Sequence, residues 1–361
     1  LRNIPGSNVS ICEIERAWLQ LTPFFCRLQI RVCLRNFGNN SRGNGFFMQS
    51  DVFYEFDAFA ESVRDVDSKM MLRNPKRRIW RHSSVNLDGV GVQFGQMGSG
   101  NLAQGQLRSD GYLLYVPITE TLEYSTNGVV LKKDSFAILE PGCEFCISTK
   151  VEHDWCGVFI PTHMLASAGA IVESPSLKRR TLRVTPPNRQ VINQIRDSVS
   201  QIMTAGANCP QFESTTAASF AAAELLRVAS LVVGGQADEP KLKPNGRPKL
   251  PREEIIRRSQ ALLAERNNQP VLVTDLAVAA GVSERTLRKA FQDYFGLGPV
   301  RYMQLIRLHQ VYRALSAADA EGVSVSEVIA RHGEWDFGRF ASRYRRLFGE
   351  LPSETLRTKK S

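Results

Sequence analysis

Cysteine is scarce in this chain, with 7 residues in 361. An odd and sparse count excludes a disulfide scaffold and favours a reducing compartment. No run reaches the roughly 18 uninterrupted apolar residues of a membrane helix, and the best one, residues 225–233, contains an arginine. The length fits two or three domains, and hydrophobic residues at 43% exclude a disordered chain. We therefore expect a cytoplasmic, globular protein with no membrane partner.

Patterns of enzyme chemistry are missing as well. The chain has no His-x-His pair, phosphate loop, dinucleotide fingerprint or Ser-His-Asp spacing. Cys143 and Cys146 form a single Cys-x-x-Cys, which we interpret as two strand positions. Glu152, His153 and Asp154 are successive and cannot all face one metal from a strand. The sequence predicts no enzyme, no catalytic residue, no metal and no cofactor.

Positive charge is concentrated at the C-terminal end. Residues 236–361 hold 22 basic and 15 acidic residues, a net charge of +7, whereas residues 48–235 hold 18 and 19, a net charge of −1. A basic block of domain size predicts an anionic partner. Residues 234–251 contain four prolines and three glycines, a composition typical of a solvated linker.

The first 47 residues show no clear period, and the first methionine is Met48. Our hypothesis is that the native protein starts there and that the leader is non-native or disordered. The expected organisation is a leader at 1–47, a cupin-like effector-sensing and dimerisation domain at 48–233, a linker at 234–251 and a DNA-binding domain at 252–361.

The middle region has the pattern of a small β-sandwich or barrel. Apolar residues alternate along 85–94, with Asp88-Gly89 shifting the register, and short apolar segments follow between turn dipeptides. Two helices are expected next, at 187–203 and 214–233; the second is apolar on most faces and packs on its own barrel or forms a dimer interface. The further strands are expected at 112–117, 129–131, 136–139, 145–147 and 155–160.

The basic region contains an internal repeat, 275–299 and 327–352. Gly281 matches Gly333 at an offset of 52, while the apolar residues that follow match at 53, so the second turn is one residue longer. Each copy predicts a helix, a turn at glycine and a second helix, with Ser283 and Asp336 as N-caps. A connecting helix is expected at 299–315, with a core stripe of Met303, Ile306 and Val311.

The second helix of each copy carries polar residues opposite its apolar stripe. Arginine and glutamine have the donors that read base edges in the major groove, and basic side chains hold phosphates. The alternative is a helical repeat with a solvated polar face. The predicted DNA-binding residues are Glu284, Arg285, Thr286, Arg288, Lys289, Gln292, Arg339, Ser342, Arg343 and Arg346.

This repeat resembles the DNA-binding domain of the AraC family of transcription regulators. The resemblance implies two helix-turn-helix units joined by one long helix and entering successive major grooves of double-stranded DNA. The stretch 333–356 is more specifically similar to the branch that includes ethanolamine-utilisation regulators, which pairs a cupin-like barrel with this unit. That branch has phenylalanine after the glycine, whereas this chain has Glu334, so we expect Trp335 to take the buried role.

A barrel without a metal triad favours a sensor of a small molecule. Tyr112, Tyr115, Phe145 and Trp155 are candidate walls of the ligand site, with Glu140 and Glu144 nearby; the alternative for each aromatic is plain core.

A second candidate site contains Arg77 and Arg81, followed by Asn86 and Asp88. This cluster resembles the PilZ-type signature that grips cyclic di-GMP, because guanidinium groups suit guanine stacking and phosphate contacts. Asp88 stands where that signature has serine.

Together these observations predict an α+β multidomain protein: a cupin-like β-barrel with helices, then an all-α domain with two helix-turn-helix units. The expected function is a DNA-binding transcriptional regulator, an activator, controlled by a small-molecule effector. A homodimer and RNA polymerase are further possible partners. The alternatives are a cupin-type enzyme fused to a nucleic-acid-binding domain and an architectural DNA binder without effector control.

Overall fold

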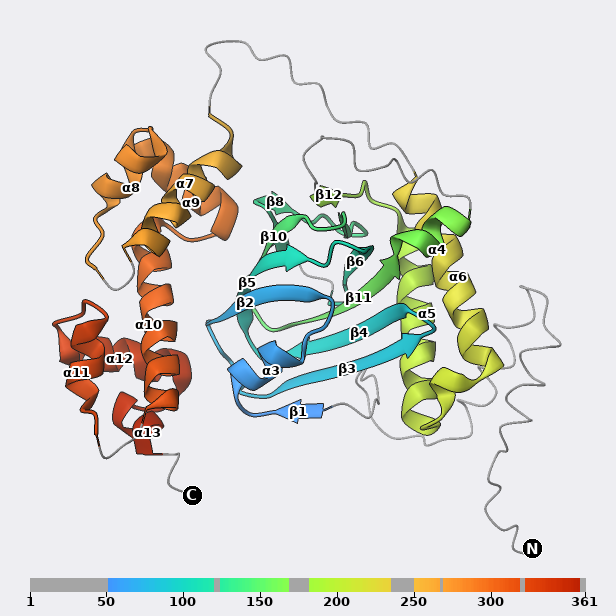
Figure 1. Ribbon diagram of the computed structural model, residues 1–361, viewed down its shortest axis with the longest axis horizontal. Helices are drawn as coiled ribbons and strands as arrows, with labels where there is room; N and C mark the ends of the chain where they lie inside the picture. Colours follow the sequence, from blue (N-terminus) through green and yellow to red (C-terminus); the bar gives the residue numbers. More distant parts are fainter. Residues whose placement is uncertain are drawn as a thin grey trace, which may run out of the picture.

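The computed structural model describes residues 51–119, 124–168, 182–234, 250–266, 269–318 and 322–357. Two antiparallel sheets lie at its centre, with the C-terminal helices on one side and the helices α5 (Arg189–Asn208) and α6 (Thr216–Val233) on the other (Figure 1). The expected leader and nearly all of the expected linker lie outside the described residues, so those two boundaries stay predictions.

The N-terminal domain consists of two facing sheets, and the short helix α3 (Phe56–Ser62) connects the first strand of one sheet to the first strand of the other. Its strands pair into two separate sheets that do not close into one barrel within the described ranges. The seven-stranded sheet has the order β1 (Asp51–Phe53), β3 (Trp80–Leu87), β4 (Val90–Met97), β11 (His153–Pro161), β6 (Gly111–Pro117), β9 (Ala137–Leu139) and β12 (Leu182–Val184). The five-stranded sheet has the order β2 (Val66–Arg73), β5 (Gly100–Leu107), β10 (Glu144–Thr149), β7 (Tyr124–Thr126) and β8 (Val129–Val130).

The strands expected from apolar alternation are present. β3 and β4 form a hairpin around the two-residue turn Asp88-Gly89, which explains the register shift in the sequence. Two long strands were not expected, β2 and β5, which pair along their whole length from Val66 opposite Leu107 to Arg73 opposite Gly100. Their sequences contain serine, lysine, glutamine and glycine, and it is this long-range pairing that holds them extended.

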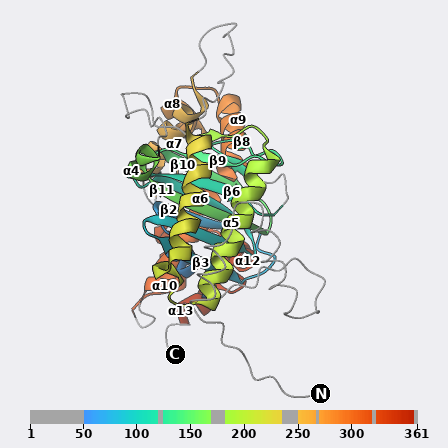
Figure 2. The same cartoon turned by 90° about the vertical axis from the view of Figure 1, so that its right-hand side faces the viewer.

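Two helices, α5 (Arg189–Asn208) and α6 (Thr216–Val233), cover the outer face of the seven-stranded sheet (Figure 2). α6 is long and apolar enough to cross a membrane by length and composition. In the structure its alanine-rich face packs with the sheet in one core, so it has the place of a core helix. This confirms packing on its own domain, although Phe220 and Leu231 remain exposed. The short helices α4 (Thr162–Ser167) and η1 (Phe212–Ser214) flank this layer.

The C-terminal domain contains the predicted repeat. Gly281 and Gly333 have φ of 70° and 72°, the left-handed conformation that a turn glycine adopts without a Cβ clash. Ser283 and Asp336 cap the second helices, each accepting a hydrogen bond from a backbone N–H three residues on, as predicted. The helices are α7 (Arg252–Glu265), α8 (Val273–Ala280), α9 (Glu284–Phe295), α10 (Pro299–Ala317), α11 (Val325–Arg331), α12 (Phe337–Phe348) and α13 (Pro352–Arg357).

The connecting helix α10 is buried along a different stripe from the one expected. Met303 and Ile306 are half-buried, whereas Tyr302 and His309 are buried together with Val311. The difference arises because the five-stranded sheet packs on the C-terminal helices, so that one hydrophobic core extends across both domains. Such packing between domains leaves no signal in the local sequence period.

Candidate nucleic-acid interface and ligand cavity

The two recognition helices, α9 and α12, bury one face and leave the opposite face open. Leu287 and Phe291 of α9, and Phe340 and Tyr344 of α12, are buried. Of the ten predicted DNA-binding residues, Glu284 and Arg343 are half-buried and the other eight are exposed, even with the N-terminal domain packed against the same helices. The arrangement therefore presents two open polar faces.

Ion pairs within α9 leave one arginine without a carboxylate. Arg288 lies 2.9 Å from Glu284, and the Lys289 ammonium lies 2.9 Å from Asp293. Across the described ranges, no ion pair is formed by Arg285. Both pairs are exposed i,i+4 pairs that contribute little stability, so their cations are available to exchange carboxylate for phosphate.

The arginines of α12 differ in freedom. Arg339 is 77% exposed by side chain and lies 3.4 Å from the N-cap carboxylate of Asp336. Arg343 is 24% exposed and lies 3.1 Å from Glu334, which also pairs with Arg307 of α10 at 3.3 Å. Arg343 thus holds the turn in place while Arg339 faces solvent.

The turn of the second unit corrects one expectation. Trp335 is 73% exposed and does not take a buried role; Glu334, 15% exposed, occupies the inside of the turn instead. Phe337 is also 40% exposed. The sequence analysis did not predict that Trp335 and Phe337 lie on the surface, although the extra residue in the second turn indicates that this turn differs from the first.

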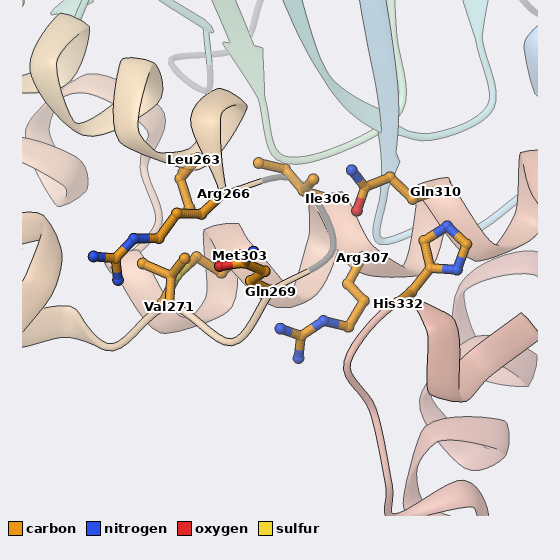
Figure 3. A pocket seen from close by; sticks show the side chains of 9 residues that line it. All are labelled: Leu263, Arg266, Gln269, Val271, Met303, Ile306, Arg307, Gln310 and His332. Carbon is orange, nitrogen blue, oxygen red and sulfur yellow. The ribbon is translucent and has the colours of Figure 1, made fainter.

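A shallow pocket lies between the two units, lined by α7, α10 and the residues around α11 (Figure 3). Its volume is about 50 Å³, and Arg266 and Arg307 lie along it. Both arginines already pair with carboxylates, Asp275 at 3.4 Å and Glu334 at 3.3 Å. The pocket therefore has room for water molecules rather than for an organic ligand.

The two sheets of the N-terminal domain enclose an apolar cavity of about 40 Å³. Three of the four predicted aromatic walls, Tyr115, Phe145 and Trp155, line it, and the rings of Tyr115 and Trp155 stack 5.9 Å apart. Burial raises the pKa of Tyr115 well above its ordinary value, so its hydroxyl stays protonated. Tyr112 belongs instead to the core between the seven-stranded sheet and its helices.

The predicted carboxylates lie outside this cavity. Glu140 is paired with Arg183 at 3.5 Å, and Glu144 is exposed at the start of β10. A volume of 40 Å³ accommodates one or two water molecules, far below the several hundred Å³ of a ligand pocket.

The second candidate site is spread over the surface. Arg77 lies 3.6 Å from Glu152, and Arg81 donates a hydrogen bond of 2.9 Å to Gln96. Asn86 accepts a hydrogen bond from the N–H of Gly89 and shapes the hairpin turn beside Asp88. Arg81 and Asn86 are five residues apart on β3, roughly 17 Å along the strand, so the structure does not bring the four residues together.

Three further polar residues that the sequence analysis considered, Cys143, Cys146 and His153, are buried in the N-terminal domain. Cys143 and Cys146 are both buried, and burial raises the pKa of the Cys146 thiol. The ring of His153 is buried with Nδ1 2.9 Å from the Val151 carbonyl oxygen, and burial lowers its pKa to about 4. No group of three metal-ligating side chains occurs within the part of the chain that the structure describes.

The comparison with known families concerns the repeat. Residues 276–358 match the family model described as "Helix-turn-helix domain". They form a helix-turn-helix domain. A relative from Rhodococcus erythropolis, named "Probable thc operon regulatory protein", is 34% identical over 36% of this chain and 39% of its own length. "XylDLEGF operon transcriptional activator 3" of Pseudomonas putida is 38% identical over 26% of this chain and 28% of its own length. Both relatives are named as regulators, and the chain spans well under half of either.

Solved structures of AraC-type proteins are also similar. A regulator from Chromobacterium violaceum is 24% identical over 30% of this chain and 95% of its own, with a TM-score of 0.28. A probable AraC family regulator from Rhodopseudomonas palustris is 28% identical over 30% of this chain and 98% of its own, with a TM-score of 0.27. The AraC-like activator CuxR covers 78% of this chain at 13% identity and a TM-score of 0.36. At these scores none of the three determines the fold of the N-terminal domain.

Proposed function

We propose that this chain is a transcriptional regulator that binds specific DNA through α9 and α12 and responds to a small molecule in its N-terminal domain. The supporting observation is that the predicted reading faces stay open while both helices are packed against the N-terminal domain. Selection of bound sequences from a random duplex library tests the proposal, because a regulator enriches one sequence and a general binder does not.

Base reading is assigned first to the exposed arginines. Arg285 and Arg288 of α9 and Arg339 and Arg346 of α12 have guanidinium groups suited to guanine edges. Lys289 then holds phosphate. The remaining contacts fall to Glu284, Thr286, Gln292, Ser342 and, through its hold on the turn, Arg343.

The aromatic pair Trp335 and Phe337 adds an apolar contact. They flank the N-cap of α12, at the end of a recognition helix that meets base edges. Apolar side chains at this place recognise the methyl group of thymine. We therefore assign thymine preference to the second unit.

The effector site is assigned to the cavity between the sheets. Its lining by Tyr115, Phe145 and Trp155 suits a largely apolar molecule, and its volume of about 40 Å³ requires the sheets to open on binding. A thermal shift that rises with ligand concentration supports the assignment, because ligand stabilises the state that binds it. A flat response across a metabolite panel favours an architectural DNA binder without effector control.

The alternative effector is cyclic di-GMP on Arg77 and Arg81, whose guanidinium groups are exposed. Calorimetric titration of the chain, repeated with Arg77→Ala/Arg81→Ala, tests it. Heat that the double variant abolishes places the nucleotide on these arginines. If the natural chain gives no heat of binding, cyclic di-GMP is not its effector, and the cavity between the sheets is the remaining candidate site.

We also propose that the two sheets have a cupin-like origin and that the chain belongs to the branch of ethanolamine-utilisation regulators. In this proposal the protein is a cytoplasmic homodimer that activates transcription through RNA polymerase. The exposed Phe220 and Leu231 on α6 make that helix the candidate dimer surface. The alternative of a cupin-type enzyme fused to a nucleic-acid-binding domain requires stoichiometric zinc, iron or manganese in the purified protein.

A further inference from the structure

Two arginines near the connection between β2 and β3 reach across to the C-terminal domain. Nη1 of Arg73, the last residue of β2, donates a hydrogen bond of 3.0 Å to the carbonyl oxygen of Phe295. Nη1 of Arg78 donates one of 3.0 Å to the carbonyl oxygen of Leu347. Phe295 is the last residue of α9, and Leu347 is the last but one of α12. Each arginine thus holds the C-terminal end of one recognition helix.

The chemistry of these contacts is favourable at a helix end. The last four carbonyl groups of a helix lack partners within it, and the helix dipole makes that end negative. The guanidinium of Arg78 also packs directly on the end of α12, because a Cβ on Gly349 would lie 2.5 Å from its central carbon. Gly349, with φ of 86°, therefore leaves the room that this contact needs.

Arg73 is buried to 5% exposure. Its hydrogen-bond partners are neutral: the Phe295 carbonyl and the hydroxyl of Ser148, which accepts a hydrogen bond of 2.7 Å. Within the described ranges it forms no ion pair with a carboxylate, and burial lowers its pKa. A buried guanidinium without a counter-charge is costly, so the carbonyl end of α9 has to compensate for the lost hydration. The contact is therefore part of the domain interface and not a chance surface bond.

We propose that Arg73 and Arg78 are positioning residues for DNA recognition: by holding both recognition helices on one short segment of the N-terminal domain, they set the base-pair spacing between the two half-sites. The inference rests on the proposed function. Each unit already packs on α10. The arginines give each recognition helix a second fixed point, and two fixed points define its direction.

The first unit is also connected to the cavity. Arg73 and Ser148 belong to β2 and β10, and Met70, Phe145 and Ile147 of the same two strands line the cavity. Arg78 lies outside both strands. A molecule that opens the cavity therefore moves the support of α9 more than the support of α12, and changes the spacing that the protein prefers.

The test uses the full chain and duplex DNA. Selection from a random library gives the preferred site, and duplexes with one or two base pairs added or removed between its half-sites then give a spacing profile. We expect affinity of the natural chain to fall at least tenfold for each base pair. We expect the variant Arg73→Ala/Arg78→Ala to lose less than threefold, because each recognition helix then has only its packing on α10 to fix its direction and can adapt to its half-site. Arg73→Lys/Arg78→Lys restores part of the selectivity.

The matched control is Arg189→Ala, which removes an exposed arginine at the first residue of α5, on the far side of the seven-stranded sheet, and leaves the interface intact. It keeps the natural profile. The same profile in the double alanine variant, or a natural chain that tolerates every spacing, overturns the inference. Failure of the natural chain to enrich any sequence refutes the proposed function instead. If the double alanine variant does not fold by circular dichroism, Arg78→Ala alone carries the test, because Arg78 is half-buried.

Discussion

The carboxylate of Glu334 lies 3.1 Å from the guanidinium of Arg343 and is 15% exposed. It also lies 3.3 Å from Arg307, so one acidic side chain joins the turn of the second unit to both α10 and α12. This explains why an acidic residue can occupy the turn position where the branch of ethanolamine-utilisation regulators has phenylalanine.

Glu334→Gln should lower the free energy of unfolding by about 2 kcal/mol, because two charge-assisted contacts of a half-buried group are lost. Urea unfolding followed by circular dichroism measures the change. The control is Glu327→Gln, which removes an exposed i,i+4 pair with Arg331 and should cost less than about 0.5 kcal/mol. Equal costs for the two variants would contradict the bridging role of Glu334.

Trp335→Ala should weaken specific DNA binding by roughly 1–2 kcal/mol and leave the unfolding midpoint unchanged, since the indole is 73% exposed and contributes little to the fold. The loss should disappear when thymine in the second half-site is replaced by uracil, which lacks the methyl group. Val278→Ala, on the exposed face of α8, is the control without effect. A full loss that persists with uracil would show that Trp335 does not read the methyl group.

Arg288→Ala and Arg339→Ala should each weaken specific binding by roughly 1–3 kcal/mol and relax the preference at one base position. Fluorescence anisotropy with the selected duplex and with a scrambled duplex measures both quantities. Arg343→Ala should instead lower stability, because its partner Glu334 loses half of its bridge. Equal losses of Arg288→Ala on both duplexes would limit that arginine to phosphate contact.

Acidification should destabilise the protein between about pH 6.5 and pH 4. Burial lowers the pKa of His82, His153 and His309 to about 4, so below pH 6.5 the unfolded chain binds protons that the folded chain does not. Each histidine then removes roughly 1.4 kcal/mol of stability per pH unit. Asp65 and Asp154, whose pKa values burial raises, offset part of this.

Urea unfolding at pH 7.5, 6 and 5 measures the slope. His309→Gln should reduce it by about one proton, since the amide can still donate to the Leu72 carbonyl that His309 faces at 3.3 Å. The exposed His163 supplies the control variant His163→Gln. A slope that His309→Gln leaves unaltered would show that His309 is protonated equally in both states.

The sequence predicted what depends on local periods. The repeat, its glycine turns, both N-caps and the β3–β4 hairpin follow from residues within one or two turns of each other, where propensity and capping decide. The reading faces are a consequence of the same periods, because burial of Leu287 or Phe340 directs the opposite residues outward.

Long-range contacts decided the rest. β2 and β5 were missed because their polar, glycine-containing sequences become strands through pairing with each other. The partners of Arg73 and Arg78 lie 222 and 269 residues away, and no spacing in the sequence reveals them. Trp335 was misplaced because Glu334 obtained two arginine partners from different helices.

The longer turn of the second unit has a consequence for the whole molecule. Two copies of one unit related by a two-fold axis would bind a symmetric DNA site equally well in either sense. Here α9 begins with the charged residues Glu284 and Arg285, whereas the aromatic residues Trp335 and Phe337 lie at the start of α12. Reversing the protein on its site would therefore place aromatic side chains where charged ones had been. In the proposed complex, the different residues at the starts of α9 and α12 thus give the protein a fixed direction along the double helix, and with it a defined upstream and downstream side.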